Sequence, residues 1–100
     1  MPSFTVDHNT NLPKSEAFQK VKKYFEESHG LRKLDNDLKC QFNEASHSGN
    51  IKGSKFECDF VITGEQTAKV SLTINIGLLL SPFKGKIQET LKTKMTELLG

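Results

Sequence analysis

The sequence contains no tryptophan, only two cysteines and three prolines, and no apolar run near the ~20 residues that a membrane-spanning helix requires. Cys40 and Cys58 are too few for a disulfide framework, and their spacing matches no zinc site. We therefore expect two reduced thiols in the core, with a redox pair as the alternative. The N-terminal residues show no basic segment followed by an apolar one, which predicts a cytoplasmic protein with no transmembrane segment.

An excess of one charge sign is also missing. Fourteen basic and twelve acidic residues give a net charge of +2 at pH 7, which is too small to indicate nucleic-acid binding. Most of the phenylalanines fall at core-facing positions, so they do not form a platform for stacking bases. Neither a repeat nor a Pro- or Gly-rich linker divides the chain, and we expect residues 1–100 to form a single domain.

The hydrophobic period changes along the chain, and each change marks an element. Alternating apolar residues predict strands, and apolar residues three or four apart predict helices. The expected elements are a strand at 4–8, a helix at 14–29, a strand at 38–42, a turn at 47–50, a third strand up to residue 62 with a bulge or bend near Gly53 and Ser54, a fourth strand at 68–76, and a closing helix from Ser81 and Pro82.

This order predicts an α+β fold of the type β-α-β-β-β-α. Short turns between the last three strands require antiparallel neighbours, so the sheet is expected to be antiparallel. Each helix has one apolar face, and we expect both amphipathic helices to pack on one face of the sheet. The first strand is expected at an edge.

No set of residues indicates catalysis, a metal site or a cofactor. His8, His29 and His47 lie near a strand end, a helix end and a hairpin turn, and none of them has a metal-binding spacing. His29 is placed to interact with a helix C-terminus, and His47 is expected to be solvated. Ser81 precedes a helix, but it lacks the nucleophile elbow, so a helix cap is the simpler role. We therefore expect no enzyme activity.

Leu78, Leu79 and Leu80 are followed closely by Phe83 at a junction between a strand and a helix. Three consecutive leucines cannot all point into a core that lies on one side of the chain. One interpretation is a wrapped corner with one leucine partly exposed. The other is an apolar surface that contacts a partner, a second subunit or a hydrophobic surface.

The segment Gly77-Leu-Leu-Leu-Ser-Pro-Phe-Lys-Gly-Lys-Ile87, with Glu89, Leu91 and a closing Glu-Leu-Leu at 97–99, resembles the polyhydroxyalkanoic acid system protein family. Upstream, the opening strand and helix of these small bacterial proteins are similar to Phe4 and Val6, followed by Leu12, Glu16, Ala17 and Val21. The resemblance covers about a quarter of the chain closely. It implies an accessory role near polyester synthesis and storage, and it brings no catalytic residues.

Two functions are compatible with these observations. The first is a non-enzymatic accessory protein of polyhydroxyalkanoate storage, which would contact the granule surface or the storage enzymes through Leu78, Leu79, Leu80 and Phe83. The alternative is a module that binds a small hydrophobic, acyl-type ligand between the sheet and the helices, with His8 or Ser71 at the rim. An enzyme built from distant residues is a third interpretation. A symmetric dimer through an edge strand or the leucine corner is compatible with each of them.

Overall fold

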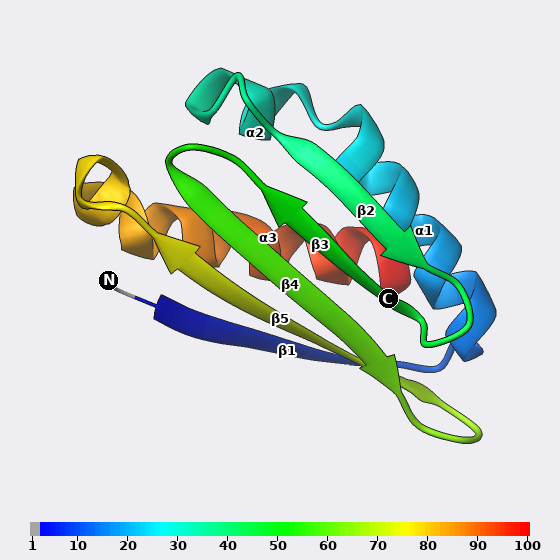
Figure 1. The fold of residues 1–100 in the computed structure, drawn as a ribbon. Coiled ribbons are helices and arrows are strands. Elements are labelled where there is room, and N and C mark those ends of the chain that lie inside the picture. Colours follow the sequence, from blue (N-terminus) through cyan, green and yellow to red (C-terminus); the bar gives the residue numbers. More distant parts are fainter. Residues whose placement is uncertain (1–2) are drawn as a thin grey trace.

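The computed structural model describes residues 3–100, in which one antiparallel sheet is covered on one face by helices (Figure 1). In chain order the elements are β1 (Ser3–Thr10), α1 (Lys14–Glu27), α2 (His29–Leu34), β2 (Lys39–Asn43), β3 (Ser48–Lys52), β4 (Phe56–Thr63), β5 (Ala68–Ile76), the 3-10 helix η1 (Leu78–Phe83) and α3 (Lys84–Leu99). The predicted α+β class is confirmed, as are the antiparallel sheet and the two amphipathic helices on one of its faces.

The strand order in the sheet is β1-β5-β4-β3-β2, and every neighbouring pair is antiparallel. β1 lies at an edge, as the sequence predicted, and it pairs with β5 along its whole length from Ser3 opposite Asn75 to Thr10 opposite Ala68. β5 therefore holds the first strand of the chain against the rest of the sheet.

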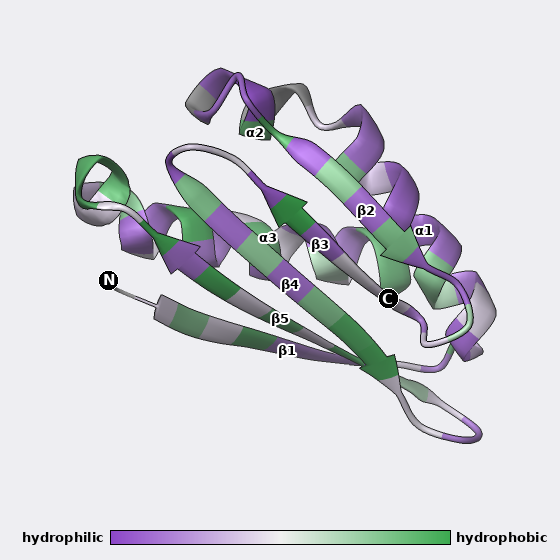
Figure 2. Ribbon diagram, viewed as in Figure 1, coloured by the Kyte–Doolittle hydropathy of each residue, from purple (hydrophilic) through white to green (hydrophobic). Residues whose placement is uncertain are grey.

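The two faces of the sheet differ in polarity because side chains alternate along each strand. One row across the sheet joins Val6, Leu72 and Phe60, all buried beneath the helices. The next row, Thr5, Thr73 and Asp59, points to the opposite face and is exposed. Figure 2 shows the alternation along β4. The helices cover only the apolar face, so the molecule has two layers.

The sequence predicts one strand between the turn at 47–50 and residue 62, but the structure has two strands there, β3 and β4. The prediction of a single bent strand is therefore wrong. Gly53 and Ser54 lie in the turn of a hairpin between β3 and β4, closed by a hydrogen bond from the Gly53 N–H to the Phe56 carbonyl (2.9 Å). The turn predicted at 47–50 is also wrong at three of its positions, since β3 begins at Ser48. At position 49 of this strand there is no room for a side chain, because a Cβ on Gly49 would stand 2.5 Å from the ring of Phe60. A residue typical of turns thus makes room for an aromatic ring.

Both predicted helices have different bounds in the structure. The first ends at Glu27, and the separate helix α2 follows after Ser28, whose hydroxyl accepts a hydrogen bond from the Leu31 N–H (3.3 Å). The closing helix begins at Lys84 rather than at Ser81. Ser81 and Pro82 lie inside η1, and the Ser81 carbonyl, not its hydroxyl, accepts a hydrogen bond from the Lys84 N–H. The predicted capping role of the Ser81 side chain is therefore wrong.

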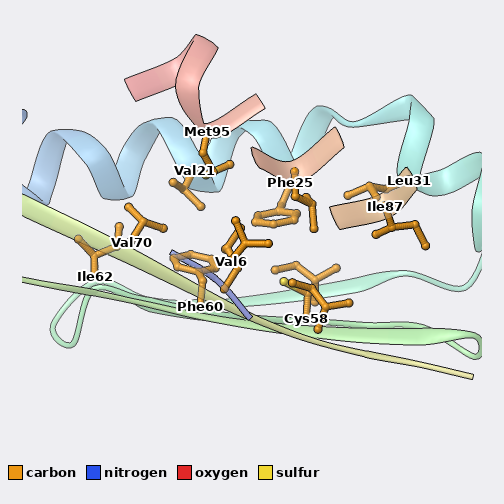
Figure 3. Close-up of a cluster of buried hydrophobic side chains, with 14 of the residues drawn as sticks. Val6, Val21, Phe25, Leu31, Cys58, Phe60, Ile62, Val70, Ile87 and Met95 are labelled. Carbon is orange, nitrogen blue, oxygen red and sulfur yellow. The ribbon is translucent and has the colours of Figure 1, made fainter. Parts of the chain in front are cut away.

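The core lies between the sheet and the two long helices (Figure 3). Phe60 of β4 is at its centre, and its ring stacks on that of Phe25 at 5.8 Å and lies 6.1 Å from that of Phe18. Val21 and Met95 meet above the sheet from α1 and α3. These side chains fill the space between the helices and the sheet.

The two cysteines occupy the core side of the sheet, as predicted. Cys58 is buried and Cys40 is half-buried. Both lie opposite Ile51, so they are two strands apart, a Cα separation of about 10 Å. A disulfide needs a Cα separation below about 7 Å, so the register excludes the alternative of a redox pair within the chain. Burial raises the pKa of both thiols, which keeps them protonated.

Candidate functional site

A groove of about 900 Å³ lies between α1 and α2 on one side and η1 and α3 on the other. Figure 1 shows that α1 and α3 approach each other toward the C-terminal end of α3 and diverge toward η1 and α2. Lys20 and Leu98 line the groove near its narrow end, and Leu31 and Phe83 line it near its wide end. Its volume is that of a typical site for a small organic ligand. We call it the lysine-rimmed groove.

The floor of the groove is apolar because both helices turn the edges of core side chains toward it. Leu31, Ile87 and Leu91 are nearly buried, and all three line the groove. Figure 3 shows Leu31 of α2 next to Ile87 of α3. Tyr24, Phe83 and Leu98 extend this surface at the sides. A ligand seated here would cover apolar area from three helical segments at once.

The rim of the groove is strongly basic. Five lysines line it, contributed by α1, α2 and α3: Lys20, Lys23, Lys33, Lys86 and Lys94. Glu27 is the single carboxylate among the lining residues in the described chain. Lys94 pairs with Glu97 at 3.1 Å, whereas no carboxylate within residues 3–100 lies within 4.0 Å of the other four. An excess of positive charge above an apolar floor favours a ligand that is apolar along its length and anionic at one end.

Tyr24 places a neutral hydroxyl in the wall of the groove. Burial raises the pKa of Tyr24, and this effect outweighs the opposite influence of the Ser28 side chain and of Lys94. The phenol therefore stays protonated at neutral pH and is able to donate a hydrogen bond to an anionic group.

The α2 wall of the groove is fixed by hydrogen bonds to α1 and to the residues just before β4. The Arg32 guanidinium donates to the carbonyl of Phe25 (3.1 Å) and thereby caps the last turn of α1. Just after α2, the buried carboxylate of Asp35 accepts hydrogen bonds from the N–H of Lys55 (2.7 Å) and the N–H of Asp37 (3.0 Å). Gly53 is required next to it, because a Cβ at this position would stand 2.1 Å from an Asp35 oxygen. The wall therefore has a firm attachment to the sheet.

The structure separates the four residues predicted to contact a partner. Leu78 and Leu79 are 84% and 76% exposed, Phe83 is 47% exposed, and Leu80 is 6% exposed. Leu80 belongs to the core, whereas Phe83 lines the groove. Two leucines rather than one are exposed, so the interpretation as a wrapped corner with one partly exposed leucine is wrong.

The predicted polar candidates do not meet in one place. The Nε2 atom of His8 lies 3.0 Å from the Gly100 carbonyl, and Ser71 lies on the outer face of the sheet, so neither is at the rim of the groove. His47 packs edge-on against Phe18 at 5.8 Å instead of being fully solvated. His29 begins α2, and its side chain lies outside the described part of the structure.

The described residues hold neither a metal site nor a membrane span. In residues 3–100, no group of three or more His, Cys, Asp or Glu side chains is arranged to hold a metal ion. No helix in the described part of the chain has the length and apolar character needed to cross a membrane.

The lysine-rimmed groove was missed by the sequence reasoning, although part of its signal is visible there. Lys20 and Lys23 flank the apolar stripe of the first helix, to which Tyr24 belongs, and Lys86 and Lys94 flank that of the last helix. On each helix alone, lysines at the edge of the apolar stripe are an ordinary feature of an amphipathic helix and do not indicate a site. The sequence does not show that these boundaries face each other, because that depends on the angle at which the helices diverge.

No protein-family model and no curated protein sequence matches the chain. Solved structures with a similar fold include TTHA0849 from Thermus thermophilus, with a TM-score of 0.68 and 13% identity over 97% of this chain and 94% of that chain. The di-domain ARO/CYC protein BexL from the BE-7585A biosynthetic pathway gives a TM-score of 0.67 and 11% identity, with 99% of this chain and 45% of BexL covered. Ara h 8.0201 gives 0.61 and 8%, with 97% of this chain and 94% of that chain covered. At these identities the likeness shows the fold alone.

Proposed function

We propose that this protein is a cytoplasmic, non-enzymatic module that binds an acyl-type ligand, an elongated apolar chain with an anionic end, in the lysine-rimmed groove. The observation that carries the proposal is the combination of an apolar floor in a groove of about 900 Å³ with five lysines and one glutamate at its rim. The site differs from the predicted one, because it lies between the helices and not between the helices and the sheet.

The physical basis of binding is the division of the groove into an apolar and a charged part. Each methylene that leaves water for the floor contributes about 0.8 kcal/mol. The lysines then determine which end group is accepted, because a carboxylate or phosphate gains charge-assisted hydrogen bonds there. The Tyr24 hydroxyl supplies one neutral donor beside them. The similarity to BexL, a protein of a biosynthetic pathway, is compatible with a fold that accommodates small organic molecules.

Charge reversal on both walls tests this proposal. We expect Lys23→Glu combined with Lys86→Glu to weaken the binding of dodecanoate about tenfold, since two attractions of partly exposed charges become repulsions. Binding is measured by titration with chemical-shift readout at the Leu31 and Ile87 methyl groups. Dodecanol, which has the same chain and no charge, is expected to bind both proteins with similar affinity.

The matched control is Lys92→Glu, an exposed lysine of α3 that does not line the groove. It is expected to leave dodecanoate binding within about twofold, the range of a long-range charge effect at physiological salt. Equal weakening by the control and the double variant, or an absence of shifts at Leu31 and Ile87 in the unmodified protein, would contradict the groove as the site.

A second candidate function is the accessory role in polyester storage. The resemblance of residues 77–87 to the polyhydroxyalkanoic acid system protein family supports it, together with the exposure of Leu78 and Leu79. In a polyester-accumulating bacterium, a fluorescently tagged chain is then expected to concentrate on granules, and to do so less when both leucines are replaced by serine. A diffuse signal with and without polyester would rule out this role.

A further inference from the structure

The most exposed apolar surface of the described chain is formed by Leu78, Leu79 and Phe83, which we call the leucine tip. All three lie in η1, which projects beyond the end of β5 (Figures 1 and 2). η1 follows Gly77, whose N–H donates to the Lys55 carbonyl at 2.8 Å. This hydrogen bond and the buried side chain of Leu80 attach the tip to the β3–β4 turn and to the core. The exposed leucines are therefore held in a defined position.

The surroundings of the leucine tip are basic. Lys55, Lys84 and Lys86 lie in the adjoining turn and the first turn of α3, and all three are exposed. The sequence contains no acidic residue between Gln66 and Gln88. In the neighbouring strand β4, the carboxylate of Glu57 already accepts a hydrogen bond from the Asn50 amide (2.7 Å). Two exposed leucines next to lysines complement a surface with an apolar interior and an anionic exterior.

The leucine tip is continuous with the wide end of the lysine-rimmed groove. Phe83 belongs to both, and Lys86 lines the groove at the start of α3. Leu78 and Leu79 do not line the groove. A surface that receives the tip would therefore stand next to the entrance of the groove without filling it.

We propose that the leucine tip inserts into an anionic phospholipid surface. The leucines enter the boundary between headgroups and acyl chains, and Lys55 and Lys84 contact the headgroups. In this orientation the wide end of the groove faces the lipid, so that an acyl ligand passes between the two with little exposure to water. The proposed docking depends only on the leucine tip, whereas the passage of a ligand rests on the proposed function.

Cosedimentation with large unilamellar vesicles tests the docking. The protein is expected to bind phosphatidylcholine vesicles that contain phosphatidylglycerol at least about tenfold more strongly than pure phosphatidylcholine, because basic side chains near an anionic surface add to the affinity. Leu78→Ser combined with Leu79→Ser is expected to reduce this binding about tenfold or more, since both leucines lose their apolar contact. Lys55→Gln combined with Lys84→Gln is expected to abolish the preference for the anionic vesicles.

The control is Val61→Ser, which removes an exposed apolar side chain (42%) from the outer face of the sheet and is expected to leave vesicle binding unchanged. The proposal is overturned if the double-serine variant binds vesicles as well as the unmodified protein does. It is also overturned if the unmodified protein binds neither kind of vesicle, or binds only to purified polyester particles. Two variants separate the failure of one proposal from the failure of the other. The double-serine variant is expected to lose vesicle binding and to keep dodecanoate binding, because Leu78 and Leu79 do not line the groove. Lys23→Glu is expected to weaken dodecanoate binding and to keep vesicle binding, because it leaves both leucines intact.

Discussion

Phe60→Ala is expected to lower the free energy of unfolding by about 4 kcal/mol, the largest effect of any single substitution considered for this protein. The ring is 2% exposed and contacts three others: it stacks on Phe25 with an interplanar angle of 13°, and it lies 6.1 Å from the rings of Phe18 and Phe42. The hairpin backbone at Gly49 is fitted against it. Its removal leaves a cavity that the helix and the strands around it would have to close together.

Chemical denaturation at neutral pH measures this loss. A domain of this size is stable by roughly 5–15 kcal/mol, so the alanine variant is expected to retain little stability; Phe60→Leu, expected to cost about 1.5 kcal/mol, gives a second point on the same scale. Val61→Ala is the control at the neighbouring position, because Val61 points to the outer face and its change is expected to stay within about 0.5 kcal/mol. Similar losses at positions 60 and 61 would contradict the assignment of the two faces of β4.

Asp35→Ala is expected to destabilise the protein by about 3 kcal/mol, since hydrogen bonds to a charged group are each worth about 1.5–3 kcal/mol. Asp35 is 1% exposed, and it accepts hydrogen bonds from the N–H groups of Lys55 and Asp37 and from the Ser54 hydroxyl (3.3 Å). Asp37→Ala is the control, because the Asp37 side chain is exposed and only its backbone takes part. The measurement is urea denaturation at pH 7.

The same carboxylate predicts a dependence of stability on pH. Burial alone would raise the pKa of Asp35, but the hydrogen bonds from Lys55, Asp37 and Ser54 outweigh burial and hold the pKa below its usual value. The contribution to stability is therefore present above the unfolded-state pKa of about 3.9 and is lost as the pH falls through the folded-state value. We expect the advantage over Asp35→Asn to shrink between about pH 5 and pH 2. An advantage that stays constant over this range would contradict the charged state.

The fold was largely predictable because its strands and long helices carry clear hydrophobic periods. Val70, Leu72, Ile74 and Ile76 alternate without interruption, and they lie in a strand that is paired on both sides. The errors fall where a residue type has a role that depends on contacts distant in sequence. Gly49 is typical of a turn, yet it lies in a strand because Phe60 occupies the space of its side chain. Ser81 is typical of a helix cap, yet the helix begins at Lys84.

The candidate site was less predictable for a different reason. Consecutive leucines followed by a phenylalanine break the pattern of the sequence, and the structure exposes Leu78, Leu79 and Phe83 but buries Leu80, which was predicted with them. The lysines of the groove break no pattern on their own helices. Lys23 and Lys86 are 63 residues apart in the sequence, as their numbers show, and only the packing of α1 and α3 places them around one apolar floor.

The pairing of β1 with β5 has a consequence for the order in which the protein assembles. Ser3 of β1 finds its partner only at Asn75, and the hydroxyl of Thr10 donates to the carbonyl of Leu99, which is 89 residues away. During synthesis the first strand therefore has no native neighbour until most of the chain has left the ribosome. Long-range pairing of this kind makes folding slower than in proteins built from local contacts. Of all the strands, this edge strand therefore waits longest for its partner, and it stays unpaired until β5 has been synthesised.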